Sequence, residues 1–331
     1  MSIRMAQYGT GHGHAAGKLQ SMLTNPDVEC VGVFEPNAER RAALEHVGGP
    51  YADVRWFECA KDMLGDPAVV AVASEGRNDE SLVQTEEIVR AGKHAWYDKP
   101  AGDDWPAWQR VAALAVKANL QVQMGYMFRY HDGFVKIADW ARSGMLGNVF
   151  SIRAHMSTNV PPSSREVIST HRGGIFYDLA GHMLDQVVWI LGRPSKVTAF
   201  LRNETGEVAA FTDNGLGVFE YEHAMATVDI AAMEPSPAAR RFEVYGTEGS
   251  AILLEPFEPG TEIRLVLTGD RDGYPAGESR VCVEGRSRQV LYDLELASFL
   301  KTISGDQPPD RPLSHELLVQ ETLLRATRGL S

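Results

Sequence analysis

The chain has 331 residues, a length typical of two domains, and 44% of them are hydrophobic, which supports packed cores and excludes a mainly disordered protein. Its 32 basic and 44 acidic side chains leave a formal net charge of -12. Because that charge repels polyphosphate backbones, nucleic acid and anionic membranes are disfavoured as partners, and a small ligand is expected.

Cysteine usage and the start of the chain bear on the compartment. The three cysteines, Cys30, Cys59 and Cys282, are far apart and lack a C-x-x-C spacing, which indicates neither a disulfide framework nor a zinc knuckle. Strand-like sequence begins within a few residues of Met1, which leaves no room for a secretory leader, and no run reaches the roughly 18 apolar residues of a membrane span. We expect a cytoplasmic protein with no membrane partner.

The first part of the chain alternates short apolar runs with helical patterns, which is typical of a parallel sheet with crossover helices. We therefore predict a doubly wound α/β domain over residues 1–123. Its six expected strands are centred on Ile3–Tyr8, Glu29–Phe34, Arg55–Phe57, Val69–Ala73, Ala95–Tyr97 and Gln121–Met124.

The pattern changes after Met124, and residues 124–331 are predicted to form a second, α+β domain. Alternating strands with turn signals run from Val197 to about Val283, which favours an open, mainly antiparallel sheet. A long polar loop, TNVPPSSREVISTHRGG, precedes an apolar helix. The expected helices are Arg129–Ser143, Ile175–Leu191, Leu291–Ile303 and Ser314–Arg328.

A glycine-rich turn, YGTGHGHAAGKL, joins the first strand to the first helix. Such a turn lets backbone N–H groups and the helix N-terminus approach a pyrophosphate closely. Gly9 and Gly11 match the first two glycines of G-x-G-x-x-G, but His14 stands at the third position, so the turn alone is a weak signal. The candidate cofactor contacts in the turn are Gly9, Thr10, Gly11, His12, Gly13 and His14.

An acidic residue, Glu35, ends the second predicted strand in VGVFEPN. It lies 24 residues beyond Gly11, near the spacing of about 20 expected for a carboxylate that accepts hydrogen bonds from ribose hydroxyls. Because a carboxylate repels a 2′-phosphate, NAD is favoured over NADP. The alternative is a simple glycine turn followed by an ordinary surface glutamate.

The two histidines of the turn raise the question of a metal site. His12 and His14 are one residue apart, and no third ligand is near them in the sequence. That pattern is more typical of hydrogen-bonding loop residues than of zinc ligands, so we expect no metal.

Two further segments carry candidate chemistry. Lys99 directly follows a predicted strand in YDKPAG, at the carboxyl end of the strand, where doubly wound sheets bind ligands. The alternative is a solvated lysine before a turn.

Asp178 and His182 are four residues apart on an apolar helix, so their side chains share one face. A carboxylate beside an imidazole fixes its tautomer and raises its basicity, which suits the imidazole to act as a general base. A structural histidine with satisfied partners is the alternative. Asp185 is expected to be an exposed or capping acid.

Together these segments resemble the glucose–fructose oxidoreductase, inositol dehydrogenase and MocA family (Gfo/Idh/MocA) over essentially the whole chain. AGKHAWYDKPAG is similar to the signature A-G-K-H-V-x-x-E-K-P, GGIFYDLAGH to G-G-G-x-x-x-D-x-x-x-H, and FEVYGTEGSAIL to a hairpin in the second domain. The resemblance implies an N-terminal Rossmann domain that binds NAD(P) and a C-terminal α/β domain. It also implies a homo-oligomer, dimer or tetramer, formed through the open sheet, and oxidation or reduction of a sugar-like alcohol.

The same resemblance implies roles for three residues. Lys99 would contact cofactor and substrate, Asp178 would bind substrate hydroxyls and orient the base, and His182 would take the hydroxyl proton. Hydride leaves an alcohol carbon for nicotinamide only as the hydroxyl loses its proton, so a base and a cation are needed at that oxygen. Further candidate substrate contacts are Arg129, His171 and Arg172.

The chain departs from the family pattern at several positions. The T-P-N-x-x-H segment appears here as GRNDES, which keeps Asn78 as a cofactor contact but places Arg77 and Ser81 at the proline and histidine positions. Asp98 replaces the acid of E-K-P. Arg172 replaces the first glycine before the catalytic helix, where it either reaches an acidic substrate group or caps a loop.

Three functions are compatible with these features. The first is an NAD-dependent sugar or polyol dehydrogenase. The second is an enzyme that retains NAD and uses transient oxidation to eliminate or hydrolyse a glycoside, with no net redox change. The third is a nucleotide-binding sensor or subunit without turnover. The altered GRNDES segment favours this third function. The presence of Lys99, Asp178 and His182 together favours the dehydrogenase.

Overall fold

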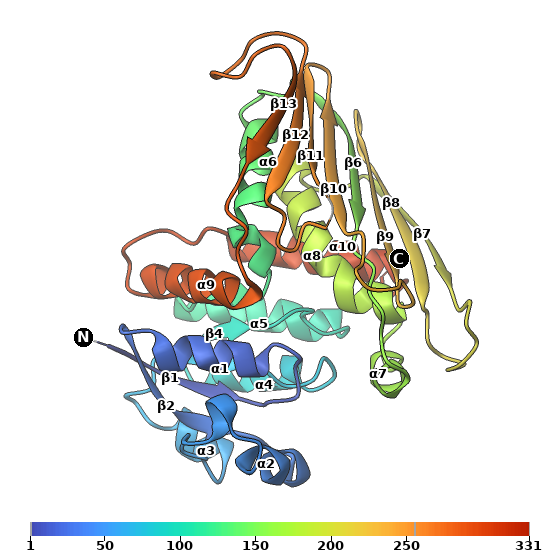
Figure 1. Ribbon diagram of the computed structural model, residues 1–331. Helices are drawn as coiled ribbons and strands as arrows, with labels where there is room; N and C mark the ends of the chain where they lie inside the picture. The colour runs from blue at the N-terminus through green and yellow to red at the C-terminus, as the bar shows by residue number, and fades with distance from the viewer. Residues whose placement is uncertain (1, 255, 331) are drawn as a thin grey trace. The chain divides into compact units, whose positions relative to one another are not determined.

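The structure is a computed structural model that describes residues 2–254 and 256–330, and the chain forms two compact units (Figure 1). The first unit comprises Met1–Gly125 and Arg288–Leu317, and the second comprises Tyr126–Ser287 and Leu318–Ser331. The expected single boundary after residue 123 therefore needs a correction, because the chain returns to the first unit near its C-terminal end.

The first unit is built on a five-stranded parallel sheet with strand order β2-β1-β3-β4-β5. All four residues of β3 are buried, which is why a strand covered on both faces reads as a continuous apolar run. The strands are β1 (Ile3–Tyr8), β2 (Val28–Phe34), β3 (Ala71–Ser74), β4 (His94–Tyr97) and β5 (Val122–Met124). The predicted doubly wound α/β fold is confirmed for this unit.

The prediction of a sixth strand at Arg55–Phe57 is wrong. The segment makes a single bridge, in which Val33 N donates to Arg55 O and Phe57 N donates to Val33 O. The chain bends away on both sides of this bridge, so the pairing never extends into a ladder.

Helices pack against the sheet of the first unit, among them α9, which comes from the far end of the sequence. Its residues Leu296, Phe299 and Leu300 join the same buried cluster as Met5 and Met22. Burying a side chain of this size contributes roughly 1.5–3 kcal/mol, so α9 belongs to this core. The helices are α1 (Ala15–Thr24), α2 (Ala38–Glu45), α3 (Ala60–Leu64), α4 (Ser81–Arg90), α5 (Trp105–Ala118) and α9 (Arg288–Ile303), with the 3₁₀ turn η1 (Gly49–Tyr51).

The second unit contains an eight-stranded sheet with strand order β13-β12-β11-β10-β6-β9-β8-β7. Every neighbouring pair is antiparallel except β6 and β9, so the predicted mainly antiparallel sheet is confirmed. The strands are β6 (Val149–His155), β7 (Lys196–Arg202), β8 (Asn214–Glu220), β9 (Met225–Ala231), β10 (Arg241–Gly246), β11 (Gly249–Leu253), β12 (Glu262–Leu267) and β13 (Gly277–Cys282).

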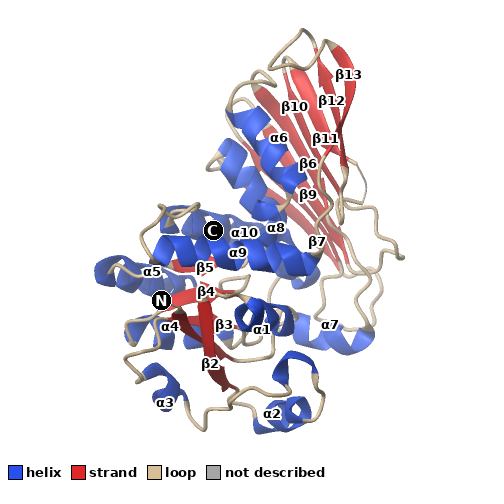
Figure 2. Ribbon diagram, turned by 60° about the vertical axis from the view of Figure 1, so that its left-hand side comes forward, coloured by secondary structure: helices blue, strands red, loops and turns tan. Residues whose placement is uncertain are grey.

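Helices cover one face of this sheet (Figure 2). Buried and more exposed residues alternate along β8 and β9, which is the period of two expected for a sheet with one packed face. The other face keeps apolar side chains exposed, including Phe200 at 59% and Met225 at 50%. The remaining elements are the 3₁₀ turn η2 (Met127–Tyr130), α6 (Asp132–Arg142), α7 (Pro162–Ile168), α8 (Gly174–Leu191) and α10 (Leu313–Ala326), the last with residues in both units.

Two expectations for the second unit need correction. The predicted polar loop contains the short helix α7, which starts with Pro162 at its first position, where a missing N–H costs nothing. The helix expected from Arg129 begins only at Asp132, because His131 accepts a hydrogen bond from Gly133 N as its N-cap. Within the described residues, no helix is both long and apolar enough to cross a membrane.

Candidate functional site

The glycine-rich turn runs tightly past the segment that follows β3. Gly9 has a φ of +84°, and a Cβ placed there would lie 2.6 Å from the backbone nitrogen of Gly76. A Cβ on Gly11 would lie 2.5 Å from Cγ of Arg77. Both positions therefore require glycine, whereas Gly13 is exposed and its Cβ would meet nothing within 4 Å.

Helix α1 begins directly after the turn, with His14 as its N-cap residue. The side chain of His14 makes no capping hydrogen bond, and no acidic residue lies in the first helical turn. His12 accepts from the amides of His14 and Ala15, through Nδ1 and its backbone oxygen. The positive end of the helix dipole remains suited to an anion. Close backbone approach at Gly9 and Gly11 together with this helix end fits the pyrophosphate of a dinucleotide.

Glu35 lies at the end of β2 with its carboxylate fully engaged by the protein, at 3% exposure. One oxygen accepts from Thr10 N at 2.8 Å and Thr10 Oγ1 at 2.6 Å, and the other accepts from Asn37 N at 2.8 Å and Arg40 Nη2 at 2.9 Å. These four donors use the roughly four acceptor positions of a carboxylate. A ribose hydroxyl would have to replace one of them.

Two arginines lie beside the turn, each held by carboxylates. Arg40 bonds Glu80 as well as Glu35, and Arg77 pairs with Asp79 at 2.8 Å and with Glu80 at 3.3 Å. Three carboxylates thus face two guanidinium groups. The local charge of this group is therefore negative.

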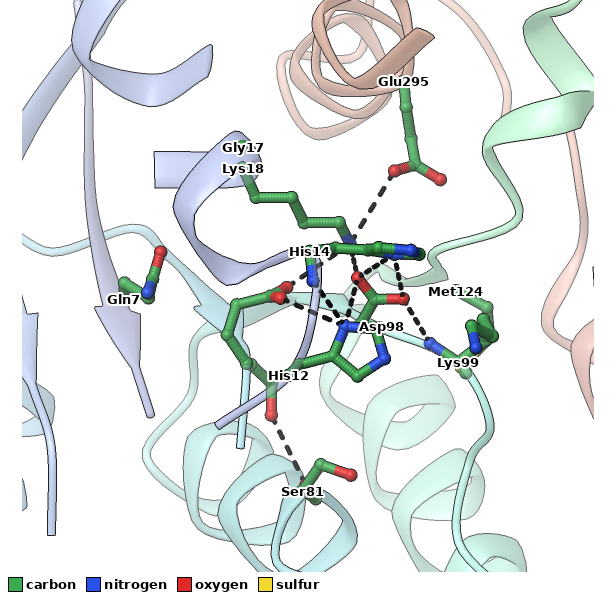
Figure 3. A network of polar contacts seen from close by, with 12 residues as sticks. Gln7, His12, His14, Gly17, Lys18, Ser81, Asp98, Lys99, Met124 and Glu295 are labelled. Atoms are coloured by element: carbon green, nitrogen blue, oxygen red, sulfur yellow. Dashed lines mark hydrogen bonds and ion pairs between the residues drawn. The ribbon is translucent and has the colours of Figure 1, made fainter. Parts of the chain in front are cut away.

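The side chains of His12 and His14 both turn toward Asp98, which follows β4 (Figure 3). His12 Nδ1 lies 3.2 Å and His14 Nδ1 lies 3.0 Å from the same oxygen, Asp98 Oδ2. The prediction that no third ligand is near the histidines considered only the neighbouring sequence. Asp98 is 84 residues from His14 in the chain but adjacent to it in space.

A fully buried lysine, Lys18, completes this cluster from helix α1. Its ammonium nitrogen lies 3.3 Å from Asp98 Oδ2, 3.4 Å from Glu75 Oε1 and 3.7 Å from Glu295 Oε2. The ring centroid of Trp96 is 4.3 Å away on another side. One ammonium therefore faces three buried carboxyl groups.

Burial and these neighbours set the protonation of the cluster. Burial alone would lower the pKa of Lys18, but the three acids outweigh it and raise that pKa. Burial raises the pKa of Glu75 well above its usual range and the pKa of Glu295 to about 7. Burial also lowers the pKa of His14 to about 4, so its imidazole is neutral at pH 7. Burial would raise the pKa of Asp98. The neighbouring His12, Lys18 and His14 outweigh that effect and hold the pKa of Asp98 well below its usual range.

Lys99 follows Asp98 at the carboxyl end of β4, as predicted, and is 3% exposed. Its backbone N–H donates to Asp98 Oδ1 at 2.7 Å, so the aspartate fixes the start of this turn. Asn78, in the segment after β3, is half-buried.

Helix α8 carries the two candidate catalytic residues of the second unit. His182 is 1% exposed, and its ring packs against Phe128 at a centroid distance of 5.2 Å and Tyr126 at 6.3 Å, edge to face in both cases. Asp178 lies one helical turn earlier and is half-buried. The helical spacing expected for this pair is therefore present.

The prediction that Asp185 is an exposed or capping acid is wrong. It is completely buried and accepts from Arg129 Nη2 at 2.5 Å and Arg129 Nε at 3.0 Å. The guanidinium of Arg129 also stacks on Trp189 at 3.8 Å. Arg129, a candidate substrate contact, is thus 4% exposed and forms a buried ion pair.

The other two candidate substrate contacts differ from each other in exposure. His171 is buried and stacks on Tyr177, with ring centroids 4.7 Å apart at an angle of 21°. Arg172 is exposed, and its Nη1 donates to the backbone oxygen of Arg328 at 3.2 Å. That contact is the loop-capping arrangement considered for Arg172 as an alternative to substrate binding.

Models of two known protein families match segments of this chain, one in each of the two units. A family model described as an oxidoreductase family with an NAD-binding Rossmann fold matches residues 3–126, and a model of the GFO/IDH/MocA C-terminal domain matches residues 134–252. The chain belongs to the Gfo/Idh/MocA oxidoreductase family.

Relatives of this Gfo/Idh/MocA protein include enzymes of known activity. The inositol 2-dehydrogenase of Cereibacter sphaeroides is 26% identical over 309 residues, which cover 91% of this chain and 86% of that protein. The 1,5-anhydro-D-fructose reductase of Ensifer adhaerens is 24% identical over 285 residues, covering 85% and 82%. A levoglucosan dehydrogenase complex with NADH and levoglucosan matches with a TM-score of 0.84 at 16% identity, over 99% of this chain and 97% of that one, which supports the fold.

Sequence reasoning missed the acidic and basic residues beneath the turn of this Gfo/Idh/MocA chain. One signal was available, because Lys18 falls on the same helix face as Ala15, Leu19 and Met22, where a core residue is expected. Glu75 likewise is completely buried and directly follows Ser74, the last residue of the buried strand β3. A charged side chain at a core position predicts a buried partner, although the sequence does not say which.

Proposed function

We propose that the chain is an NAD-dependent oxidoreductase that transfers a hydride between nicotinamide and a hydroxyl-bearing carbon of a sugar, sugar acid or polyol. The observation that carries this proposal is the presence of Lys99, Asp178 and His182 in the signatures of a family whose two domains both match this chain. Each residue type suits one part of an alcohol oxidation.

Cofactor binding is assigned to the glycine turn and the start of α1. Gly9 and Gly11 permit close approach of the backbone to a pyrophosphate, and the N-terminal end of α1 supplies favourable charge. Glu35 and its carboxylate neighbours support NAD rather than NADP, since Arg40 is already neutralised. When bound, the nicotinamide accepts or donates the hydride.

The chain's own residues supply acid–base chemistry and charge. In this proposal His182 takes the proton from the reacting hydroxyl, Asp178 binds a substrate hydroxyl and orients the imidazole, and Lys99 stabilises the developing negative charge on oxygen. General-base catalysis of this kind typically contributes about 10²–10⁴-fold to the rate. The activities of the named relatives, on inositol and on an anhydro sugar, support a carbohydrate-like substrate.

The test is a screen of sugars, sugar acids and inositols with NAD, read at the NADH absorbance band. We expect at least one compound to give steady NADH accumulation, with turnover reduced about 10²–10⁴-fold in His182→Ala and NAD affinity nearly unchanged. The matched control is His223→Ala, whose side chain is 85% exposed.

The same screen separates the alternatives. Product formed without NADH accumulation would mean an enzyme that retains its cofactor and uses transient oxidation. Tight NAD binding without turnover of any compound would mean a nucleotide-binding sensor or subunit. Full activity of His182→Ala would contradict the assignment of the base.

A further inference from the structure

Two side chains of the glycine-rich turn and one from the end of β4 have the chemistry of metal ligands. Among the described residues, His12, His14 and Asp98 form a group whose ligand atoms all lie within 4.8 Å of one another. The histidines come from the turn between β1 and α1, and the aspartate comes from the end of β4. All three belong to the first unit.

The distances within this group suit a small divalent ion. Tetrahedral zinc with bonds of about 2.0–2.1 Å to nitrogen and about 2.0–2.2 Å to oxygen places neighbouring ligand atoms roughly 3.3–3.5 Å apart. The Nδ1 atoms of His12 and His14 lie 3.2 and 3.0 Å from Asp98 Oδ2. A shift of a few tenths of an ångström would give both edges of a coordination shell. Two imidazoles and a carboxylate are also a donor set common to zinc and other transition metals.

A second observation concerns Glu75, which is completely buried beside the group. Its carboxylate lies 3.9 Å from His12 Nδ1, and neither of its oxygens forms a well-shaped hydrogen bond within the described residues. Burying an ionised carboxylate without hydrogen-bond donors raises the free energy of the folded state unless a cation or a proton neutralises its charge. Lys18 supplies one positive charge to the buried carboxyl groups of Glu75, Asp98 and Glu295, and a dication beside them would supply further compensation.

The hydrogen bonds at His12 point the same way. Its Nδ1 faces the His14 amide at 3.1 Å, which requires a lone pair, and also faces Asp98, which requires a proton. A single ring nitrogen satisfies only one of these demands. A cation between the imidazole and the carboxylate would remove the need for a proton on Nδ1, but it would take the lone pair that now accepts from the His14 amide.

We propose that His12, His14 and Asp98 bind one divalent transition-metal ion, with zinc as the reference ion. The ion fastens the glycine-rich turn to the end of β4, directly before Lys99. Glu75 is the fourth group within reach, and Lys18 is a fixed cation that limits the affinity. Metal binding at this site can be measured without NAD and without hydride transfer.

The test uses the full-length protein stripped with a chelator and then dialysed. Calorimetric titration with Zn²⁺ is expected to give one ion per chain, and Co²⁺ is expected to give the visible spectrum of a nitrogen- and oxygen-ligated site. His12→Gln and His14→Gln should each weaken zinc binding at least about 100-fold, because loss of a ligand costs no less than loss of a supporting residue. The matched control, His46→Gln at an exposed position of the same unit, should bind zinc as the wild type does.

Two results would overturn the proposal. One is wild-type protein that binds no stoichiometric zinc, in which case protons and Lys18 alone hold the cluster together. The other is zinc binding that persists in both His12→Gln and His14→Gln. Asp98→Asn, which keeps the shape of the side chain, provides a third variant; with folding checked by thermal unfolding, its unchanged affinity would also count against the site.

Discussion

The buried pair of Arg129 and Asp185 allows the sharpest prediction of a stability change. Replacing Arg129 with methionine keeps much of the packing against Trp189 but removes the guanidinium from a carboxylate that is completely buried. Breaking one side of a buried ion pair costs about 3–5 kcal/mol. At about 2–4 °C per kcal/mol for a folding unit of this size, the thermal midpoint of the second unit should fall by roughly 6–20 °C.

The assay is urea and thermal unfolding followed by tryptophan fluorescence, with the transitions of the two units fitted separately. Arg142→Met is the matched control, because Arg142 is exposed and lies over the same Trp189 ring at 5.4 Å. It should cost less than about 1 kcal/mol. The double variant Arg129→Met/Asp185→Leu should recover most of the loss, since an apolar pair can replace a buried ion pair with little penalty.

A different outcome would refute this reasoning. If Arg129→Met were as stable as Arg142→Met but lost turnover or substrate affinity, the guanidinium would be a substrate contact rather than a partner of Asp185. A double variant less stable than Arg129→Met would equally contradict the account of the buried charge.

Three further predictions concern separate parts of the molecule. Gly9→Ala should lower the free energy of unfolding by at least about 2 kcal/mol, because Gly9 has a positive φ and an added Cβ would clash with the backbone of Gly76. Gly13→Ala should change that free energy little, since its Cβ would meet nothing. Equal losses for the two variants in urea unfolding would contradict this. The hydrogen bond with Asp229 raises the pKa of His155, so its contribution to stability is complete below the unfolded pKa of about 6.5 and is lost as pH rises through the higher folded pKa. The stability difference between wild type and His155→Gln should therefore shrink from about pH 5.5 to about pH 8.5, and a constant difference would contradict the shift. If the chain forms the homo-oligomer that the resemblance implies, Phe200→Glu, on the exposed face of the second sheet, should reduce the particle size measured by light scattering. An oligomer that persists unchanged would exclude that face as the interface.

The parts of the fold that were predictable are those with local patterns. The buried parallel strands read as short apolar runs, and the alternation in β8 and β9 indicated a sheet with one packed face. The failures have non-local causes. Arg55–Phe57 has strand-like composition but only one bonded partner, and the apolar face of α9 does not show that it packs beside Met5 and Met22 rather than in the second unit.

The candidate site divides in the same way. Gly9, Gly11 and the Asp178 and His182 pair follow from spacing along the chain, because a turn or a helix fixes their geometry locally. The contacts of Asp98 with two histidines 84 and 86 residues earlier do not follow from spacing. Neither does the burial of Asp185, whose partner Arg129 lies 56 residues away.

The central claim is that this chain moves a hydride from a carbinol carbon to bound NAD. The most direct measurement uses the best compound from the carbohydrate screen, carrying deuterium at the reacting carbon, with the reduced nicotinamide analysed by mass spectrometry. The account predicts that NADH accumulates and carries the deuterium. Unlabelled cofactor that stays oxidised at the end of the reaction, with a product of unchanged oxidation state, would contradict it.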